Sequence, residues 1–268
     1  MSTATLPLPS PATGFARTFS IFLTETRHEF IRAVRTRTFS LSAIGFPVMF
    51  YVLFGIVLNR GNMSSGVSVA KYMLGGYAVF GIVGAALFSI GIGVAADLSA
   101  GWLELKRASP MPTIAYLMSK CCTAMAFGII ILTLLCALGI TMAHVQLTVG
   151  EYLRMAALTI AGSIPFACMG LVLALTVPFN SAPGIANLIL MPMSFLSGLW
   201  IPVQMLPPFL RTLAPVFPTF HLAQLMLSIF HAELPGSVAW HHWLYLVGFS
   251  AVMLSIAAFA FRRREQNS

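Results

Sequence analysis

Charge is what this sequence most lacks. Only 8% of its 268 residues are Asp, Glu, Lys or Arg, and 58% are hydrophobic, whereas about a quarter of the residues in a typical soluble domain are charged. Apolar residues predominate from about Thr38 to Phe261, with no polar block long enough for a soluble domain. The composition therefore excludes a water-soluble fold and indicates one membrane domain with a short polar lead-in.

Acidic residues are the scarcest charges. Asp97 is the only aspartate, and none of the glutamates lies near the centre of a long apolar run. This distribution disfavours paired catalytic carboxylates within the membrane and the intramembrane carboxylates of ion-coupled carriers. A membrane-embedded enzyme and an ion-coupled secondary transporter therefore stay as minor alternatives. The phosphate-binding pattern G-x-x-x-x-G-K-[ST] is absent as well, so we expect no ATP hydrolysis and no bound cofactor in this chain.

Candidate metal ligands are also few. The four cysteines lie in apolar stretches without the paired spacing of a zinc site, so we interpret them as free thiols, with a redox or metal role as the minor alternative. His231, His241 and His242 lie at the edge of an apolar run, where polar side chains of a wet interface are expected. The sequence predicts no metal site.

The net charge of +8 comes from basic residues that flank apolar runs. In that position Lys and Arg contact anionic lipid head groups. We therefore expect membrane lipids as partners and no nucleic acid.

Long uncharged runs define the candidate membrane-spanning helices. About 20 apolar residues cross the hydrocarbon core, and a charge at the centre costs roughly 2.5 to 3.5 kcal/mol. We place the first three spans in residues 38–59, 72–96 and 121–150. The 56 uncharged residues from Met155 to Leu210 are too many for one crossing, and the turn signals of residues 178–184 divide them into spans four and five. The sixth span covers about Trp243 to Phe261.

A seventh crossing is conceivable, because residues 212–232 are also uncharged. Six spans and a cytoplasmic N-terminus put eleven Lys and Arg residues inside and four outside, whereas seven spans give eight against seven. The bias toward positive charge inside favours six. Residues 201–232 are then predicted to form a re-entrant segment in the outer leaflet.

The segment before the first span has helical periodicity. One face of residues 15–37 is apolar and is formed by Phe15, Phe19, Phe22, Phe30 and Val34. The candidate functional residues of this helix are polar and lie outside that face: Glu29, Arg32 and Arg35. This pattern predicts an amphipathic helix at the membrane interface, with a basic disordered segment as the alternative. We expect residues 1–14 to be a disordered tail.

The predicted fold is therefore an all-α integral membrane protein. It has six transmembrane helices in residues 38–262, an N-terminal amphipathic interfacial helix, and a re-entrant outer-leaflet segment between helices five and six. Residues 263–268 form a cytoplasmic tail.

The cytoplasmic loop of residues 97–113 carries the most informative motif. Gly101 can end the preceding helix, and residues 102–108 can form a short amphipathic helix that Ser109 and Pro110 terminate. A solvated loop without function is the alternative. A rigid charged element held between two long helices is suited to pass force into the membrane.

In this loop the sequence resembles the permeases of ABC-2 type ATP-binding-cassette exporters, whose pattern G-[TW]-L-E followed by a Ser-Pro turn is matched by Gly101, Trp102, Leu103, Glu104, Ser109 and Pro110. A second match runs from Phe195 to Pro202 and from Pro218 to His221, and resembles the end of span five and the outer re-entrant helices of that family. Several relatives carry a charged pair ahead of the loop glycine, where this chain has Asp97-Leu-Ser-Ala.

The resemblance implies a permease driven by a separate ATPase subunit that binds ATP and Mg. It implies two permease copies (a homodimer), or this chain and a close permease partner, in a two-plus-two complex with the ATPase in the bacterial cytoplasmic (inner) membrane, with both termini in the cytoplasm. The ATPase-coupling residues would be Gly101, Trp102, Leu103, Glu104, Leu105, Lys106, Arg107, Ser109 and Pro110.

The resemblance also implies export of a hydrophobic or amphiphilic compound, drug-like or lipid, with lipid-linked polysaccharide as the alternative cargo. The residues that would line this uncharged path are aromatic, with lipid-facing or core packing as the alternative for each of them: Phe46, Phe50, Phe54, Phe195 and Trp200.

Overall fold

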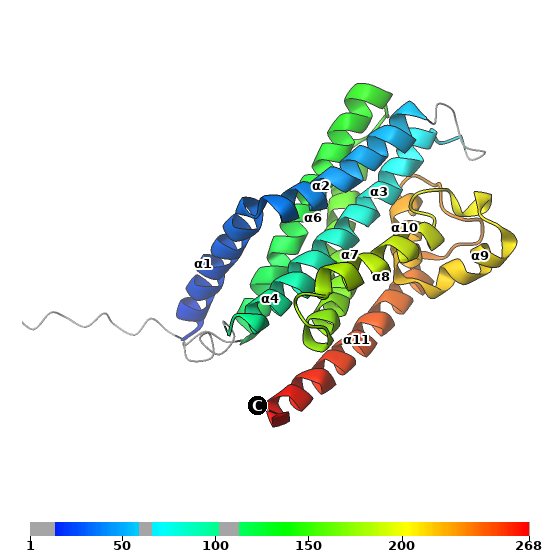
Figure 1. The fold of residues 1–268 in the computed structure, drawn as a ribbon. Helices are drawn as coiled ribbons and strands as arrows, with labels where there is room; N and C mark the ends of the chain where they lie inside the picture. Colours follow the sequence, from blue (N-terminus) through cyan, green and yellow to red (C-terminus); the bar gives the residue numbers. More distant parts are fainter. Residues whose placement is uncertain (1–13, 59–65, 102–112, 268) are drawn as a thin grey trace, which may run out of the picture.

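The computed structural model describes residues 14–58, 66–101 and 113–267, and these residues form helices with no β-strand among them. The tail of residues 1–13 and most of the predicted coupling segment lie outside the described residues. Figure 1 shows a bundle of long helices, with the C-terminal end of α11 at the same end of the bundle as α4. The all-α membrane fold expected from the composition is confirmed.

Among the residues that the structure describes, five helical segments are long and apolar enough to cross a membrane. The first joins α2 (Arg37–Phe50) to η1 (Tyr51–Val57), and the second joins α3 (Val69–Ala86), η2 (Leu87–Ile92) and α4 (Gly93–Ser99). The others are α6 (Thr113–Ala143), α7 (Val149–Thr176) and α11 (Ala239–Asn267). These helices coincide with five of the six predicted spans.

The predicted fifth span is α8 (Ala182–Leu196), which has only 15 residues. At 1.5 Å per residue it is about 22 Å long, less than the roughly 30 Å of a hydrocarbon core. The helix stops early because Gly198 takes a left-handed conformation with φ of 79°. The amide of Leu199 then donates to the carbonyl of Ser194 at 3.1 Å, which is a Schellman-type cap.

The N-terminal segment forms α1 (Gly14–Arg35), and a break at Thr36 separates it from α2. One face of α1 packs against the bundle: the ring of Phe30 lies 5.7 Å from that of Phe127 in α6. The predicted helix of residues 15–37 is therefore present.

The central helix of the bundle is α3, in which every residue from Tyr72 to Ala86 is buried. By contrast, only 11% of the apolar window of α11 and 22% of that of α2 and η1 is buried. The exposed apolar surface of these helices is suited to lipid or to another membrane chain.

Residues 201–232 fold into short helices at the end of the bundle away from α4 (Figure 1). They are η3 (Val203–Met205), α9 (Pro208–Leu213), η4 (Ala214–Val216) and α10 (Pro218–Ser228). Every residue of α10 from Pro218 to Leu227 is buried. Its Leu227 lies against Gly75 of α3, where an added Cβ would come within 3.3 Å of the leucine side chain. The segment is thus folded back against the bundle.

Candidate functional site

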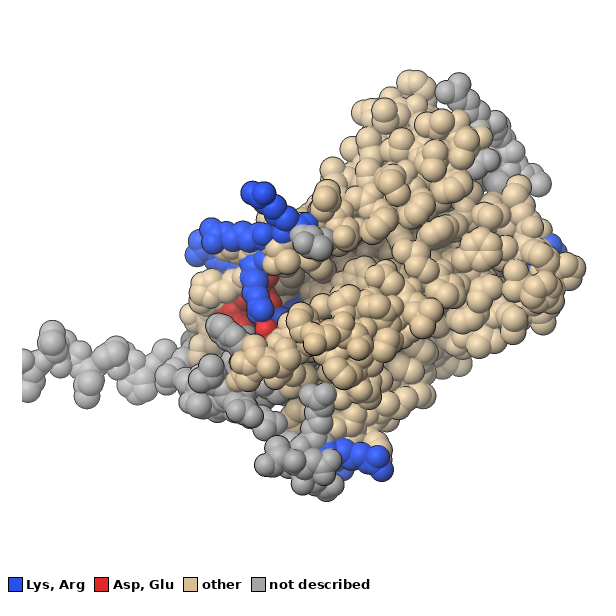
Figure 2. Space-filling model, viewed as in Figure 1, with Lys and Arg blue, Asp and Glu red and all other residues tan. Residues whose placement is uncertain are grey.

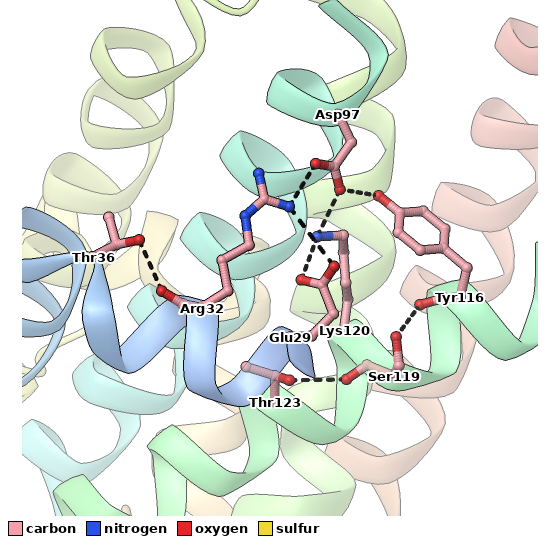
Figure 3. A network of polar contacts seen from close by, with 8 residues as sticks. All are labelled: Glu29, Arg32, Thr36, Asp97, Tyr116, Ser119, Lys120 and Thr123. Atoms are coloured by element: carbon pink, nitrogen blue, oxygen red, sulfur yellow. Dashed lines mark hydrogen bonds and ion pairs between the residues drawn. The ribbon is translucent and has the colours of Figure 1, made fainter. Parts of the chain in front are cut away.

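Three helices meet at a cluster of charged side chains at the end of the bundle where α4 terminates (Figure 3). Glu29 and Arg32 come from α1, Asp97 comes from α4, and Tyr116 and Lys120 come from α6. We call these five residues the charge cluster.

Asp97 is the centre of the charge cluster. One of its carboxylate oxygens accepts a hydrogen bond from Nη1 of Arg32 at 2.8 Å. The other accepts from the Tyr116 hydroxyl at 2.6 Å and lies 2.9 Å from Nζ of Lys120. Nζ of Lys120 also donates to Glu29 at 2.8 Å, and Arg32 lies 3.8 Å from the same glutamate. Each carboxylate is therefore shared by both cations.

Burial makes these contacts strong. The side chains of Asp97 and Lys120 are 1% and 3% exposed, and that of Glu29 is 10% exposed. Separating buried partners leaves an uncompensated charge, which typically costs about 3–5 kcal/mol. Arg32 differs because its side chain is 53% exposed. Its hydrogen bond to Asp97 nevertheless raises the pKa of Arg32 above its ordinary value.

Helical spacing explains how the sequence presents these groups. Tyr116 and Lys120 are four residues apart in α6, and Glu29 and Arg32 are three apart in α1, so each pair lies on one helical face. Between them in α6, the hydroxyl of Ser119 donates to the backbone carbonyl of Tyr116 at 2.7 Å. Ser119 is therefore satisfied within its own helix, and the contacts to α1 and α4 come from Tyr116 and Lys120.

The charge cluster brackets the predicted coupling segment. On one side α4 ends at Ser99, two residues after Asp97, and Gly101 follows with φ of 69°. Gly101 therefore ends the helix, as the sequence predicts. On the other side α6 begins at Thr113, three residues before Tyr116. The remaining predicted coupling residues lie outside the described residues: Trp102, Leu103, Glu104, Leu105, Lys106, Arg107, Ser109 and Pro110.

Comparison with known proteins identifies the family of this chain. A family profile described as ABC-2 type transporter matches residues 21–231, from α1 through α10. The chain belongs to the ABC-2 type transporter family. It is also 22% identical over 237 residues to YvfS of Bacillus subtilis (strain 168), named as a transport permease, with 88% of this chain and 95% of that protein covered. This ABC-2 type chain is accordingly a transmembrane permease subunit of an ABC transporter.

Four of the five predicted substrate-path residues of this ABC-2 type permease lie together. Phe50 stacks on Phe46 and Phe54 with ring centroids 6.2 and 6.1 Å apart, and its ring lies 4.6 Å from that of Trp200. Phe195 lies in α8 and is 38% exposed. The aromatic stack of Phe46, Phe50, Phe54 and Trp200 thus joins α2 and η1 to the chain just after α8.

Of the three polar candidates on α1, two belong to the charge cluster, whereas Arg35 is exposed at the end of the helix. Sequence patterns alone did not identify Asp97, Tyr116 and Lys120 as their partners. One signal in the sequence could have suggested this pairing. Asp97 and Lys120 carry opposite charges, and each directly borders one of the two apolar runs that the loop connects.

No group of three or more His, Cys, Asp or Glu side chains suited to a metal occurs in the part of the chain that the structure describes. The four cysteines are free thiols. His242 bonds through its ring nitrogens to His221 at 2.8 Å and to the hydroxyl of Ser237 at 2.7 Å. These contacts join α10 to the start of α11.

Proposed function

We propose that this permease is the membrane half of an ATP-driven exporter of hydrophobic or amphiphilic compounds, drug-like or lipid. It acts in the bacterial cytoplasmic membrane with both termini in the cytoplasm. A separate ATPase subunit binds ATP and Mg and docks on the segment that follows Gly101. The family membership supports the ATPase partner, and the charge cluster supports the docking position.

The observation that carries the proposal is that the helices on the two sides of residues 102–112 are bonded to each other. Asp97 precedes Gly101 by four residues, Tyr116 follows Thr113 by three, and the two are joined by a 2.6 Å hydrogen bond. Lys120 and Arg32 extend this connection to α1. Because opening the buried contacts costs about 3–5 kcal/mol, a displacement of this segment is passed to α1, α4 and α6 together.

The aromatic stack is the second element of the proposal. Phe46 is 43% exposed, and Met49 and Leu53 on neighbouring positions are 50% and 41% exposed. A second copy of the chain would face this surface and complete an uncharged path between the two copies. Aromatic and aliphatic walls suit an apolar or amphiphilic cargo.

The test uses Glu104→Gln. Glu265→Gln is the matched control because it makes the same charge change at the C-terminal end of α11, outside the predicted coupling segment. The wild-type chain and both variants are purified with their ABC ATPase and reconstituted into liposomes. We expect Glu104→Gln to lose most of the co-purified ATPase and its ATP hydrolysis, and Glu265→Gln to retain both. Equal recovery of ATPase by the two variants would remove the docking role.

The cargo is tested in the same liposomes. ATP-dependent movement of a fluorescent amphiphile such as Hoechst 33342 or a labelled lipid supports the proposal. Transport that continues without the ATPase and collapses with the ion gradient would identify an ion-coupled carrier instead.

A further inference from the structure

A small cavity lies directly beside the charge cluster. It has a volume of about 240 Å³ and opens between the end of α1, the start of α2, η2 with α4, and the start of α6. One side of its wall is polar and contains Arg32, Glu29 and Lys120, while apolar side chains such as Phe88 and Ile92 form another side. The cavity therefore has the two surfaces that an amphiphile requires.

The polar wall has a surplus of hydrogen-bond donors. A guanidinium carries five N–H groups on three nitrogens, and within the described part of the chain Arg32 contacts its acidic partners through Nη1 alone. Its side chain is 53% exposed and lines the cavity. By contrast, Glu29 and Lys120 face each other at 2.8 Å, so the charges of both are met. The N–H groups left for a ligand on this wall thus belong to the Arg32 cation.

The surroundings favour the same sign. Three further arginines of α1 and the start of α2 are exposed: Arg27, Arg35 and Arg37. Figure 2 shows Lys and Arg side chains gathered over this end of the molecule around a small acidic patch. A ligand head group with negative charge is attracted here, and a cation is repelled. The planar guanidinium fork also suits the two oxygens of a phosphate.

The size of the cavity distinguishes the ligand from the cargo. Sites for drug-sized molecules occupy about 300–1,000 Å³, more than the 240 Å³ available here. A phosphate head group beside Arg32 with the first part of one acyl chain against Phe88 and Ile92 needs less room.

We propose that this cavity binds an anionic phospholipid of the cytoplasmic leaflet, with its phosphate on the remaining N–H groups of Arg32 and one acyl chain along the apolar wall. The lipid head group then shares Arg32 with Asp97, four residues before Gly101. The lipid thereby sets how firmly α1 is held to α4. This last consequence rests on the proposed function, whereas lipid binding itself does not.

The test is competitive lipid retention. Detergent-purified chain, without the ATPase, is incubated with equal amounts of dioleoylphosphatidylglycerol and dioleoylphosphatidylcholine, and bound lipid is counted by native mass spectrometry. Both lipids carry a phosphate, but the choline cation is repelled by the surrounding arginines. We therefore expect phosphatidylglycerol to be retained about tenfold over phosphatidylcholine.

Two substitutions and one control locate the site. Arg32→Gln should abolish the preference, whereas Arg35→Gln, which makes the same charge change on the same helix outside the cavity, should keep it. Ala96→Leu fills the cavity without changing a charge and should also lose the bound phosphatidylglycerol. If Arg32→Gln does not fold, the Ala96→Leu variant decides on its own.

Equal retention by the wild type and Ala96→Leu, or by Arg32→Gln and Arg35→Gln, would overturn the proposal. A final arm adds inorganic phosphate to the chain that has already bound phosphatidylglycerol. Complete displacement of phosphatidylglycerol by phosphate at the same concentration would identify a site for the free anion and would also overturn it. Because no ATPase is present, these outcomes are independent of the docking test on Glu104.

Discussion

Replacing Lys120 with methionine removes the buried one of the two cations that the carboxylates of the charge cluster share. Nζ of Lys120 lies 2.8 Å from Glu29 and 2.9 Å from Asp97, and its side chain is 3% exposed. Methionine fills a similar volume but leaves two buried carboxylates facing each other, with only the half-exposed Arg32 to compensate them. On the scale of broken buried ion pairs, we expect a loss of about 3–5 kcal/mol in the free energy of unfolding.

Arg32→Met is the matched comparison. It also removes one cation from the charge cluster, but the Arg32 side chain is 53% exposed. Water can replace part of its contact with Asp97, so the loss is closer to that of a solvent-screened pair, about 1 kcal/mol or less. Combining Lys120→Met with Glu29→Gln removes a cation and an anion together and should recover part of the lost stability.

The measurement is the thermal midpoint of the detergent-purified chain, followed by the loss of its monodisperse peak in size-exclusion chromatography. The expected order from most to least stable is wild type, Arg32→Met, the double variant and Lys120→Met. A soluble protein of this size loses about 2–4 °C per kcal/mol, so Lys120→Met should differ from Arg32→Met by several degrees. A midpoint for Lys120→Met equal to that of the wild type would refute the idea that the buried contacts hold the three helices together.

Three further outcomes are expected. Because Gly101 has φ of 69° and open space where an alanine Cβ would lie, Gly101→Ala should cost about 1 kcal/mol through backbone strain and reduce co-purified ATPase, while Gly101→Asn, which tolerates this conformation, should reduce it less. Gly170→Val places a Cβ 3.1 Å from the amide nitrogen of Gly91, so it should cost about 1–3 kcal/mol and lower the thermal midpoint, whereas Gly248→Val, with open space around it, should not. Burial lowers the pKa of His221, so the folded protein favours the neutral ring. The contribution of His221 to stability is therefore complete above the pKa of about 6.5 that the histidine has in the unfolded chain, and it is lost as the pH falls from there through the pKa of the folded state. The protection of α10 amides from hydrogen exchange, relative to the intrinsic exchange rate at each pH, should therefore fall from pH 7 to pH 5 in the wild type and much less in His221→Gln.

The long helices could be predicted from the sequence because hydrocarbon excludes charge, so uncharged runs mark the crossings. The same reasoning misplaced the start of the third span. It set the boundary after Lys120, but α6 begins at Thr113 and contains this lysine in its second turn. The rule treats a charge as a boundary, whereas a charge that meets its partners within the bundle can lie inside the helix.

The fifth span shows a different limit. Apolar content alone extends the run to Leu210, yet the helix ends at Leu196. The cap at Gly198 depends on local backbone geometry, which one glycine in an apolar run indicates only weakly. The short helices that follow were predicted as a re-entrant segment, and their packing against α3 depends on small residues such as Gly75 on another helix.

Only those features of the candidate site that lie within one helix or loop could be predicted from the sequence. The loop motif identified Gly101 as a helix end, and the pattern of α1 singled out Glu29 and Arg32. Their partners are far away in the sequence: Arg32 binds Asp97 across 65 residues, and Lys120 binds Glu29 across 91. No periodicity within one helix contains such a pairing, because it exists only once α1 is packed on the bundle.

This dependence on packing gives the charge cluster a second consequence. Asp97 of α4 and Lys120 of α6 lie 2.9 Å apart, and each gains a second partner of opposite charge when α1 packs on the bundle, because Arg32 binds Asp97 and Glu29 binds Lys120. The contacts that join the ends of α4 and α6 to each other are therefore strengthened by α1, which binds both ends. Since these ends flank residues 102–112, loss of the α1 contacts is expected to weaken the support of the segment proposed to receive the ATPase, while the direct contacts between α4 and α6 keep its two ends together.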